Sequence, residues 1–187
     1  GGVRSPLTGG RHVDVTPRTY ARVMYRDFSL RRAAQTDAMF LGDMLVEAAN
    51  WRAGGVRPRH EVLTSADHRR YLAGWKRTAD DGLVATASDD VPVGAAWYRV
   101  LPQDAPGFGF IGVAVPELII GVHPLWRARG VGRSLLRGIV HLAGSQGHAR
   151  ISLSVERDNF ARNLYRAEGF AVVREGESWD TMARGTA

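Results

Sequence analysis

Apolar residues in the first half of the chain recur at helical spacing in one segment. After Thr36, whose side chain is typical of a helix N-cap, the apolar positions fall three or four residues apart. They are Met39, Phe40, Met44, Leu45 and Ala48. This helix is expected to end near Trp51, before the Gly54–Gly55 break. A second helix is predicted over residues 66–77.

Shorter apolar runs bounded by Gly, Pro or Asp predict strands. They lie at residues 28–31, 83–87, 92–100, 117–122, 150–155 and 170–173. Acidic turns at residues 80–82 and 88–90 flank the second run, so residues 83–100 are expected to form an antiparallel hairpin. Helical spacing returns at residues 131–143 and 159–167. The alternation of strand and helix in the last third predicts an α/β fold with a βαβ-type unit.

Length and composition are those of one globular domain. The chain has 187 residues, of which 44% are hydrophobic and 24% charged. Residues 1–27 are expected to be an N-terminal tail, and residues 28–187 the folded domain. No apolar run approaches the roughly 20 residues that cross a bilayer, and no charged-then-apolar leader opens the sequence. We therefore expect a soluble, cytoplasmic protein that does not associate with membranes.

Several function classes are disfavoured by residue usage. The absence of Cys excludes a disulfide scaffold, a thiolate metal site and a cysteine nucleophile. The net charge of +6 comes from arginines spread along the chain, so we expect no nucleic-acid partner. His60 and His68 are eight residues apart, which does not fit adjacent metal ligands, so they are interpreted as surface residues and no metal is expected.

Two glycine-rich segments could bind a phosphate-bearing ligand, and their contexts differ. Residues 107–112 spell a dinucleotide fingerprint, but they precede a strand instead of a helix, so that interpretation is discarded. In the other segment, Pro124 ends a strand, and Gly130 and Gly132 stand where the next helix begins. A helix N-terminus presents unpaired amides to an anion, and Arg127, Arg129, Arg133 and Ser134 surround it. These residues leave a diphosphate site and an ordinary strand–helix turn equally open.

Two sequence landmarks resemble one enzyme family. Val122-x-Pro124 followed by Arg127-x-x-Gly130-x-Gly132 resembles the acetyl-CoA motif of the GCN5-related N-acetyltransferase (GNAT) superfamily. Residues 158–170, with Asn159, Ala161, Leu164-Tyr165 and Gly169-Phe170, resemble its second landmark. The resemblance covers residues 28–182. It implies a mixed β-sheet flanked by helices, which splays open between the strands at 117–122 and 150–155, and it implies acetyl-CoA as cosubstrate.

The resemblance also implies which residues bind the cosubstrate. The backbone of Ile120, Gly121 and Val122 is expected to pair with the pantetheine arm. The diphosphate is expected at Arg127 and on the segment Arg129, Gly130, Val131, Gly132, Arg133 and Ser134. The family's pantetheine-binding Asn corresponds to Asp158, with Asn159 one residue late, so this contact is open between the two.

The implied reaction is direct transfer of acetyl to a primary amine of an unidentified small molecule or peptide. An attacking amine must lose a proton and a leaving thiolate must gain one. Tyr165 stands where the family places its thiolate donor; the alternative is a core aromatic residue. Glu117 begins the central strand, where many members carry a base that acts through water; the alternative is a solvated carboxylate. A non-catalytic acyl-CoA sensor is the second functional hypothesis, and a homodimer is left open.

Overall fold

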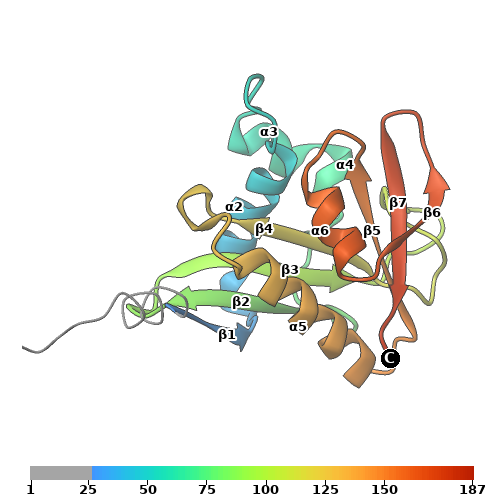
Figure 1. Cartoon of the computed structure of the whole chain (residues 1–187). Helices are drawn as coiled ribbons and strands as arrows, with labels where there is room; N and C mark the ends of the chain where they lie inside the picture. The colour runs from blue at the N-terminus through green and yellow to red at the C-terminus, as the bar shows by residue number, and fades with distance from the viewer. Residues whose placement is uncertain (1–26) are drawn as a thin grey trace, which may run out of the picture.

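The computed structural model describes residues 27–187 (Figure 1), so the predicted tail at residues 1–27 lies outside the described residues except for its last position. The strands are β1 (Phe28–Arg32), β2 (Asp81–Ala87), β3 (Pro92–Arg99), β4 (Glu117–Val122), β5 (Arg150–Glu156), β6 (Ala171–Glu175) and β7 (Trp179–Gly185). The helices are α2 (Ala38–Ala49), α3 (Arg59–Thr64), α4 (Ala66–Arg69), α5 (Val131–Ser145) and α6 (Ala161–Ala167). Single 3₁₀ turns, η1 (Gln35–Asp37) and η2 (Pro124–Trp126), precede α2 and α5.

The strands form one mixed sheet in the order β1-β2-β3-β4-β5-β7-β6. Every neighbouring pair is antiparallel except β4 and β5, which are parallel. These two strands are in register at a single pair, Glu117 and Ser152, and then diverge. Figure 1 shows the consequence, because β5 and β7 run steeply across the direction of β3 and β4. The expected splayed sheet is therefore confirmed.

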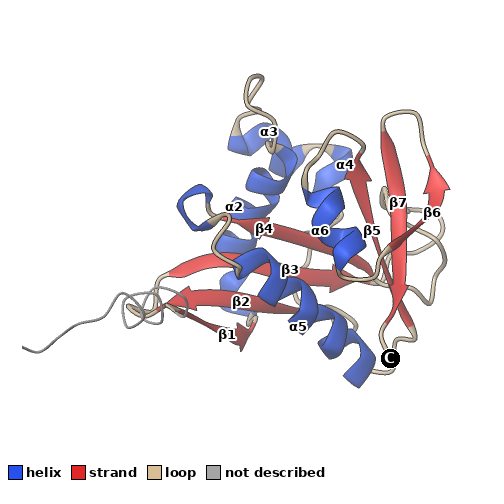
Figure 2. Cartoon of the chain, viewed as in Figure 1, coloured by secondary structure: helices blue, strands red, loops and turns tan. Residues whose placement is uncertain are grey.

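Side-chain alternation along the central strands divides the apolar core into two layers. Tyr98 and Leu118 pack with α5 and α6, whereas their neighbours Trp97 and Ile119 pack with α2 and the α3–α4 segment. Successive side chains of a strand point to opposite faces, so each strand supplies both layers. Figure 2 shows α5 and α6 on one side of the strands and α2 on the other.

Most predicted elements are present, but the helix predicted over residues 66–77 is wrong. The chain forms short helices α3 and α4 and leaves helical geometry after Arg69. Residues 70–80 instead follow an irregular path whose carbonyls bind side chains of β3: Trp97 Nε1 donates to the Tyr71 carbonyl at 2.8 Å, and Arg99 Nη1 to the Arg70 carbonyl at 2.8 Å. Tertiary hydrogen bonds thus outweigh the helical spacing of Tyr71, Leu72 and Trp75.

One further expectation fails, and one strand was missed, because charged residues are buried. Residues 80–82 are not a solvated turn: Asp80 is buried against Arg99, and Asp81 begins β2 with Arg32 and Lys76 as partners. Strand β7 was not predicted, because Asp180 and Thr181 interrupt its apolar pattern. Asp180 is fully buried and receives hydrogen bonds from Arg157 and Arg162, which makes a polar residue compatible with this strand.

Candidate active site

A cleft of about 1000 Å³ runs through the sheet where β4 and β5 diverge. It is lined from both faces of the sheet, which is possible because the gap removes the strand-to-strand contact beyond Glu117. From the α5–α6 face come Gly130, Gly132, Arg133, Leu164 and Tyr165. From the α2–α4 face come Leu45, Trp51, His68, Tyr71 and Phe108. A molecule in the cleft could therefore be reached by groups on both sides.

The β4 edge forms one wall of the cleft. Ile120, Gly121 and Val122, the predicted pantetheine contacts, all line it. Gly121 is also required by packing, because a Cβ there would lie 2.2 Å from the Met44 carbonyl oxygen of α2. Beyond Glu117 this strand has no partner on the β5 side, so backbone groups on that edge are available to an extended ligand.

The N-terminus of α5 opens into the same cleft. Gly130 is the N-cap and has a φ of +85°, a left-handed conformation that favours glycine. The first helical bond runs from the Ser134 amide to the Gly130 carbonyl at 3.0 Å. The amides of Val131, Gly132 and Arg133 have no hydrogen-bond partner within the described residues, although the Val131 side chain is buried in the core. Free amides at the positive end of a 15-residue helix can bind an anion.

The three predicted arginines have different surroundings. Arg127 lines the cleft and is held by Glu47, with Nη2 to Oε2 at 2.7 Å, and by the Val122 carbonyl at 3.1 Å from Nε. Arg133 lines the cleft and pairs with Glu168 at 3.0 Å. Arg129 lies with its guanidinium carbon 5.4 Å from the centre of the Trp126 ring, outside the cleft lining. Ser134 is also outside the lining.

Asp158 and Asn159 are placed differently by the structure. Asn159 lines the cleft, and its Oδ1 accepts a hydrogen bond from the Ala161 amide at 2.9 Å, at the start of α6. Asp158 is exposed, pairs with Arg52 at 3.3 Å and does not line the cleft. The placement favours Asn159 as a ligand contact over Asp158.

Tyr165 lies on α6, at the wall of the cleft that faces α5. Its ring is buried and packs against Phe170 with ring centres 6.0 Å apart. Its hydroxyl has no hydrogen-bond partner among the described residues, and burial raises its pKa. The side chain is therefore a core aromatic residue that also lines the cleft, and its role as thiolate donor stays a prediction.

Glu117 is a buried carboxylate, not a solvated one, with an exposed fraction of 2%. Its Oε1 accepts two hydrogen bonds, from the Tyr71 hydroxyl at 2.6 Å and the Gly109 amide at 2.7 Å. Its Oε2 is buried and has no partner within the described residues. Burial raises the pKa of Glu117, and these two hydrogen bonds only partly oppose that effect. The carboxyl group can therefore exchange a proton nearer to neutral pH than an ordinary glutamate.

The sequence interpretation missed two residues that line the cleft on the Glu117 side, His68 and Tyr71. His68 is not a surface residue: it lines the cleft, is half-buried beside Phe108, and its Nδ1 lies 3.0 Å from the Ser65 hydroxyl. Burial and the nearby charge of Arg57 lower the pKa of His68, which favours the neutral imidazole. The sequence around Tyr71 shows only an apolar spacing, which gives no indication of a functional role. The glycines at 107 and 109 form a recognisable Gly-rich pattern in the sequence.

No three His, Asp or Glu side chains between residues 27 and 187 lie close enough together to hold a metal ion. In the same part of the chain, no helix has the length and apolar character to cross a membrane.

The sequence matches one family profile, described as the acetyltransferase (GNAT) family, over residues 45–170. A mycothiol acetyltransferase of Nocardiopsis dassonvillei is 36% identical over 139 residues, which cover 72% of this chain and 39% of the relative. Another, from Propionibacterium freudenreichii subsp. shermanii, is 34% identical over 134 residues, which cover 70% of this chain and 40% of the relative. The chain thus matches only about two fifths of the length of these relatives.

Solved structures share the fold. The PaiA N-acetyltransferase of Thermoplasma acidophilum in complex with coenzyme A has a TM-score of 0.61 at 17% identity, covering 86% of this chain and 99% of that one. YncA of Salmonella typhimurium, described as a putative acetyltransferase with its cofactor acetyl-CoA, has a TM-score of 0.59 at 21% identity, covering 87% and 95%. At these identities the similarity establishes the architecture alone.

Proposed function

The chain belongs to the GNAT acetyltransferase family, and we propose that it is an N-acetyltransferase that moves acetyl from acetyl-CoA directly to a primary amine. One observation carries the proposal: a single cleft through the sheet has an unpaired β4 edge along one wall, with Glu117 on one face and Tyr165 on the other. A binding protein for acyl-CoA needs the edge and the anion site, but it does not need a buried carboxyl group and a buried tyrosine on different faces of the same cleft.

The cosubstrate fits the features at one end of the cleft. The free amides of Val131, Gly132 and Arg133 would bind its diphosphate, and the β4 edge at Ile120–Val122 would pair with the pantetheine amides. Asn159 also lines the cleft and offers an amide side chain. Bound there, acetyl-CoA supplies an activated acyl group, and the protein needs to supply only positioning and proton transfer.

Proton transfer is assigned to groups on opposite sides of the sheet. We assign Glu117 as the base that accepts the proton of the amine, through a water molecule, because its raised pKa allows proton exchange near neutral pH. We assign Tyr165 as the donor to the departing thiolate, because burial keeps its hydroxyl protonated. Two groups are needed because the amine nitrogen and the thioester sulfur are different atoms. The packing of Tyr165 in the α5 layer, and of Tyr71, the partner of Glu117, in the α2 layer, supports this division of roles.

The experiment is a thiol-release assay with acetyl-CoA and a panel of small amines and N-terminal peptides. Because the chain contains no Cys, the protein itself adds no thiol to the signal. The relatives are named for mycothiol, so unacetylated mycothiol belongs in the panel, read by mass spectrometry since it carries a thiol. Amine-dependent release that is lost in Glu117→Gln is the expected result. Tight acetyl-CoA binding without release for any amine would contradict the enzyme and support the acyl-CoA sensor.

A further inference from the structure

The glycine-rich loop at residues 107–109 has a position in the structure that its match to the dinucleotide-binding motif does not explain. It lies directly over the Glu117 carboxyl group. A Cβ at Gly107 would lie 2.0 Å from Glu117 Oε2, and one at Gly109 would lie 2.6 Å from the backbone carbon of Leu153 on β5. The Gly109 amide donates to Glu117 Oε1 at 2.7 Å. Because glycine has no side chain, the loop can pack directly against the carboxyl group, at the point where β4 and β5 begin to diverge.

Tyr71 connects this loop to Glu117. Its hydroxyl donates to Glu117 Oε1 at 2.6 Å and accepts a hydrogen bond from the Phe108 amide at 2.8 Å. Both hydrogen-bonding roles of one phenolic oxygen are thus used, and the residue is buried. The oxygen is fixed between the loop and the carboxylate.

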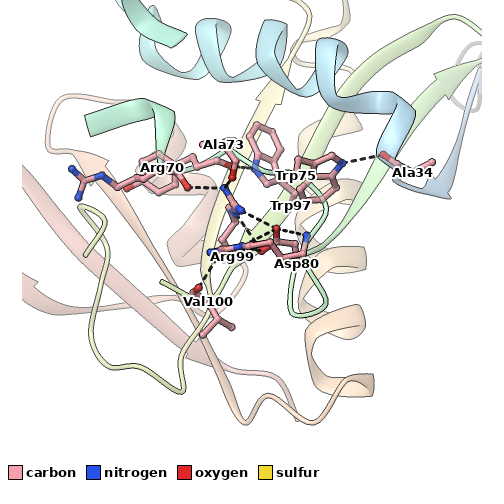
Figure 3. A network of polar contacts seen from close by, with 10 residues as sticks. Ala34, Arg70, Ala73, Trp75, Asp80, Trp97, Arg99 and Val100 are labelled. Carbon is pink, nitrogen blue, oxygen red and sulfur yellow. Dashed lines mark hydrogen bonds and ion pairs between the residues drawn. The ribbon is translucent and has the colours of Figure 1, made fainter. Parts of the chain in front are cut away.

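The backbone around Tyr71 is itself fixed by buried side chains of β3. Figure 3 shows Arg99 between Arg70, Ala73 and Asp80. Trp97 Nε1 donates to the Tyr71 carbonyl at 2.8 Å. Arg99, which is 1% exposed, donates at 2.8 Å to the carbonyls of Arg70 and Ala73 and pairs with Asp80 at 2.9 Å. A segment without regular secondary structure is thereby held by three of its carbonyls, those of Arg70, Tyr71 and Ala73.

We propose that Tyr71 and the loop Gly107–Phe108–Gly109, together called the Glu117 clamp, position the carboxyl group so that Oε1 is saturated and Oε2 alone is left to exchange the proton. The clamp rests on the proposed function, and Tyr71 acts in it as a positioning residue through Glu117. Two donors on one oxygen and none on the other fix which oxygen is basic.

The clamp makes a prediction that a purely structural role for Tyr71 does not make. A hydrogen bond donated to a carboxylate stabilises its charged form, so removing it raises the carboxyl pKa. The charges that also act on Glu117 are the guanidinium groups of Arg70 and Arg174, and both remain in a Tyr71→Phe variant. The acid limb of kcat/KM should therefore move to higher pH by about one unit.

The test compares pH profiles of kcat/KM for wild type, Tyr71→Phe and Tyr98→Phe. Tyr98 is an equally buried tyrosine that packs in the α5 layer and does not line the cleft, so its variant controls for the loss of a buried hydroxyl. The upward shift is expected in Tyr71→Phe alone, with unchanged affinity for CoA. If kcat/KM of Tyr71→Phe fell by the same factor at every pH and its acid limb did not move, the clamp would be refuted. The proposed acetyltransferase activity would be unaffected by that result.

A second variant tests the loop itself. Gly107→Ala should lower kcat/KM at least about tenfold because its methyl group would occupy the space beside Oε2. Gly185→Ala is the control, since a Cβ there meets nothing closer than 3.9 Å. Wild-type activity in Gly107→Ala would overturn the assignment of Oε2.

The clamp can also be tested without turnover. A ¹³C-carboxyl titration follows Glu117 directly, with the signal assigned by its absence in Glu117→Gln. A higher midpoint in Tyr71→Phe than in wild type is expected, and an identical midpoint would overturn the clamp. If wild type releases no CoA from acetyl-CoA with any amine, the proposed function is refuted. The titration still tests the clamp in that case, because it does not depend on turnover.

Discussion

Replacing Tyr165 by Phe separates the two roles of this side chain. The ring is 8% exposed and packs against Phe170, and both features survive the substitution. The hydroxyl forms no hydrogen bond with the described residues, so its removal should change the free energy of unfolding by less than about 1 kcal/mol. Loss of a proton donor to the leaving thiolate should instead lower kcat by about 100-fold or more.

The assay measures three quantities on one preparation: kcat by thiol release, Kd for CoA by calorimetry, and the free energy of unfolding in denaturant. Tyr98→Phe provides the same chemical change in a buried tyrosine outside the cleft. We expect kcat to fall in Tyr165→Phe alone, with CoA affinity within about twofold of wild type. A kcat within twofold of wild type would refute the donor assignment, and a parallel loss of CoA affinity would assign the hydroxyl to binding.

Three further predictions concern the cosubstrate site, the base and the scaffold. Gly132→Val should raise the Kd for CoA at least about tenfold, because its side chain would cover the free amides of α5. The protein should still fold, since the nearest atoms to a Cβ there lie at 3.7 and 3.8 Å. Equal affinity in a titration would place the diphosphate elsewhere. Because burial raises the pKa of Glu117 and the base must be ionised, kcat/KM should decline as pH falls through a value above the usual 4.3 or so, and a limb at the ordinary value would argue against this base. Asp80→Asn should lower the free energy of unfolding by about 3–5 kcal/mol because it leaves Arg99 buried without its carboxylate, and wild-type stability in denaturant would contradict that account.

The part of the fold to which we assign the cosubstrate site was accessible to sequence reasoning. Strand β4 was predicted with its observed bounds, and α5 from its first residue, because an apolar run ends at Pro124 and helical spacing begins after Gly130. Local periodicity and turn chemistry determine these elements, so a single sequence contains the information.

The side of the cleft that holds Glu117 was not accessible in the same way. Tyr71 contacts Glu117 across 46 residues of sequence, and it does so from a segment that the apolar spacing predicted as helix. The deciding interactions are long-range hydrogen bonds from Trp97 and Arg99, which leave no periodic signal. Buried charged residues are mispredicted for the same reason. Aspartate is typical of solvated turns, but Asp80 and Asp180 are as buried as core residues.

The register of β4 connects the fold to the proposed chemistry. Glu117 has the same parity along the strand as Ile119, which packs in the α2 layer, whereas Leu118 packs in the α5 layer with Tyr165. A slip of one residue would therefore move the carboxyl group to the face that already holds the hydroxyl. Both groups to which we assign proton transfer would then lie on one side of the gap. Antiparallel pairing with β3, in which Glu117 lies opposite Arg99, prevents that slip. Arg99 in turn binds the carbonyls on either side of Tyr71, so one strand pair sets both the face of Glu117 and the position of its hydrogen-bond donor.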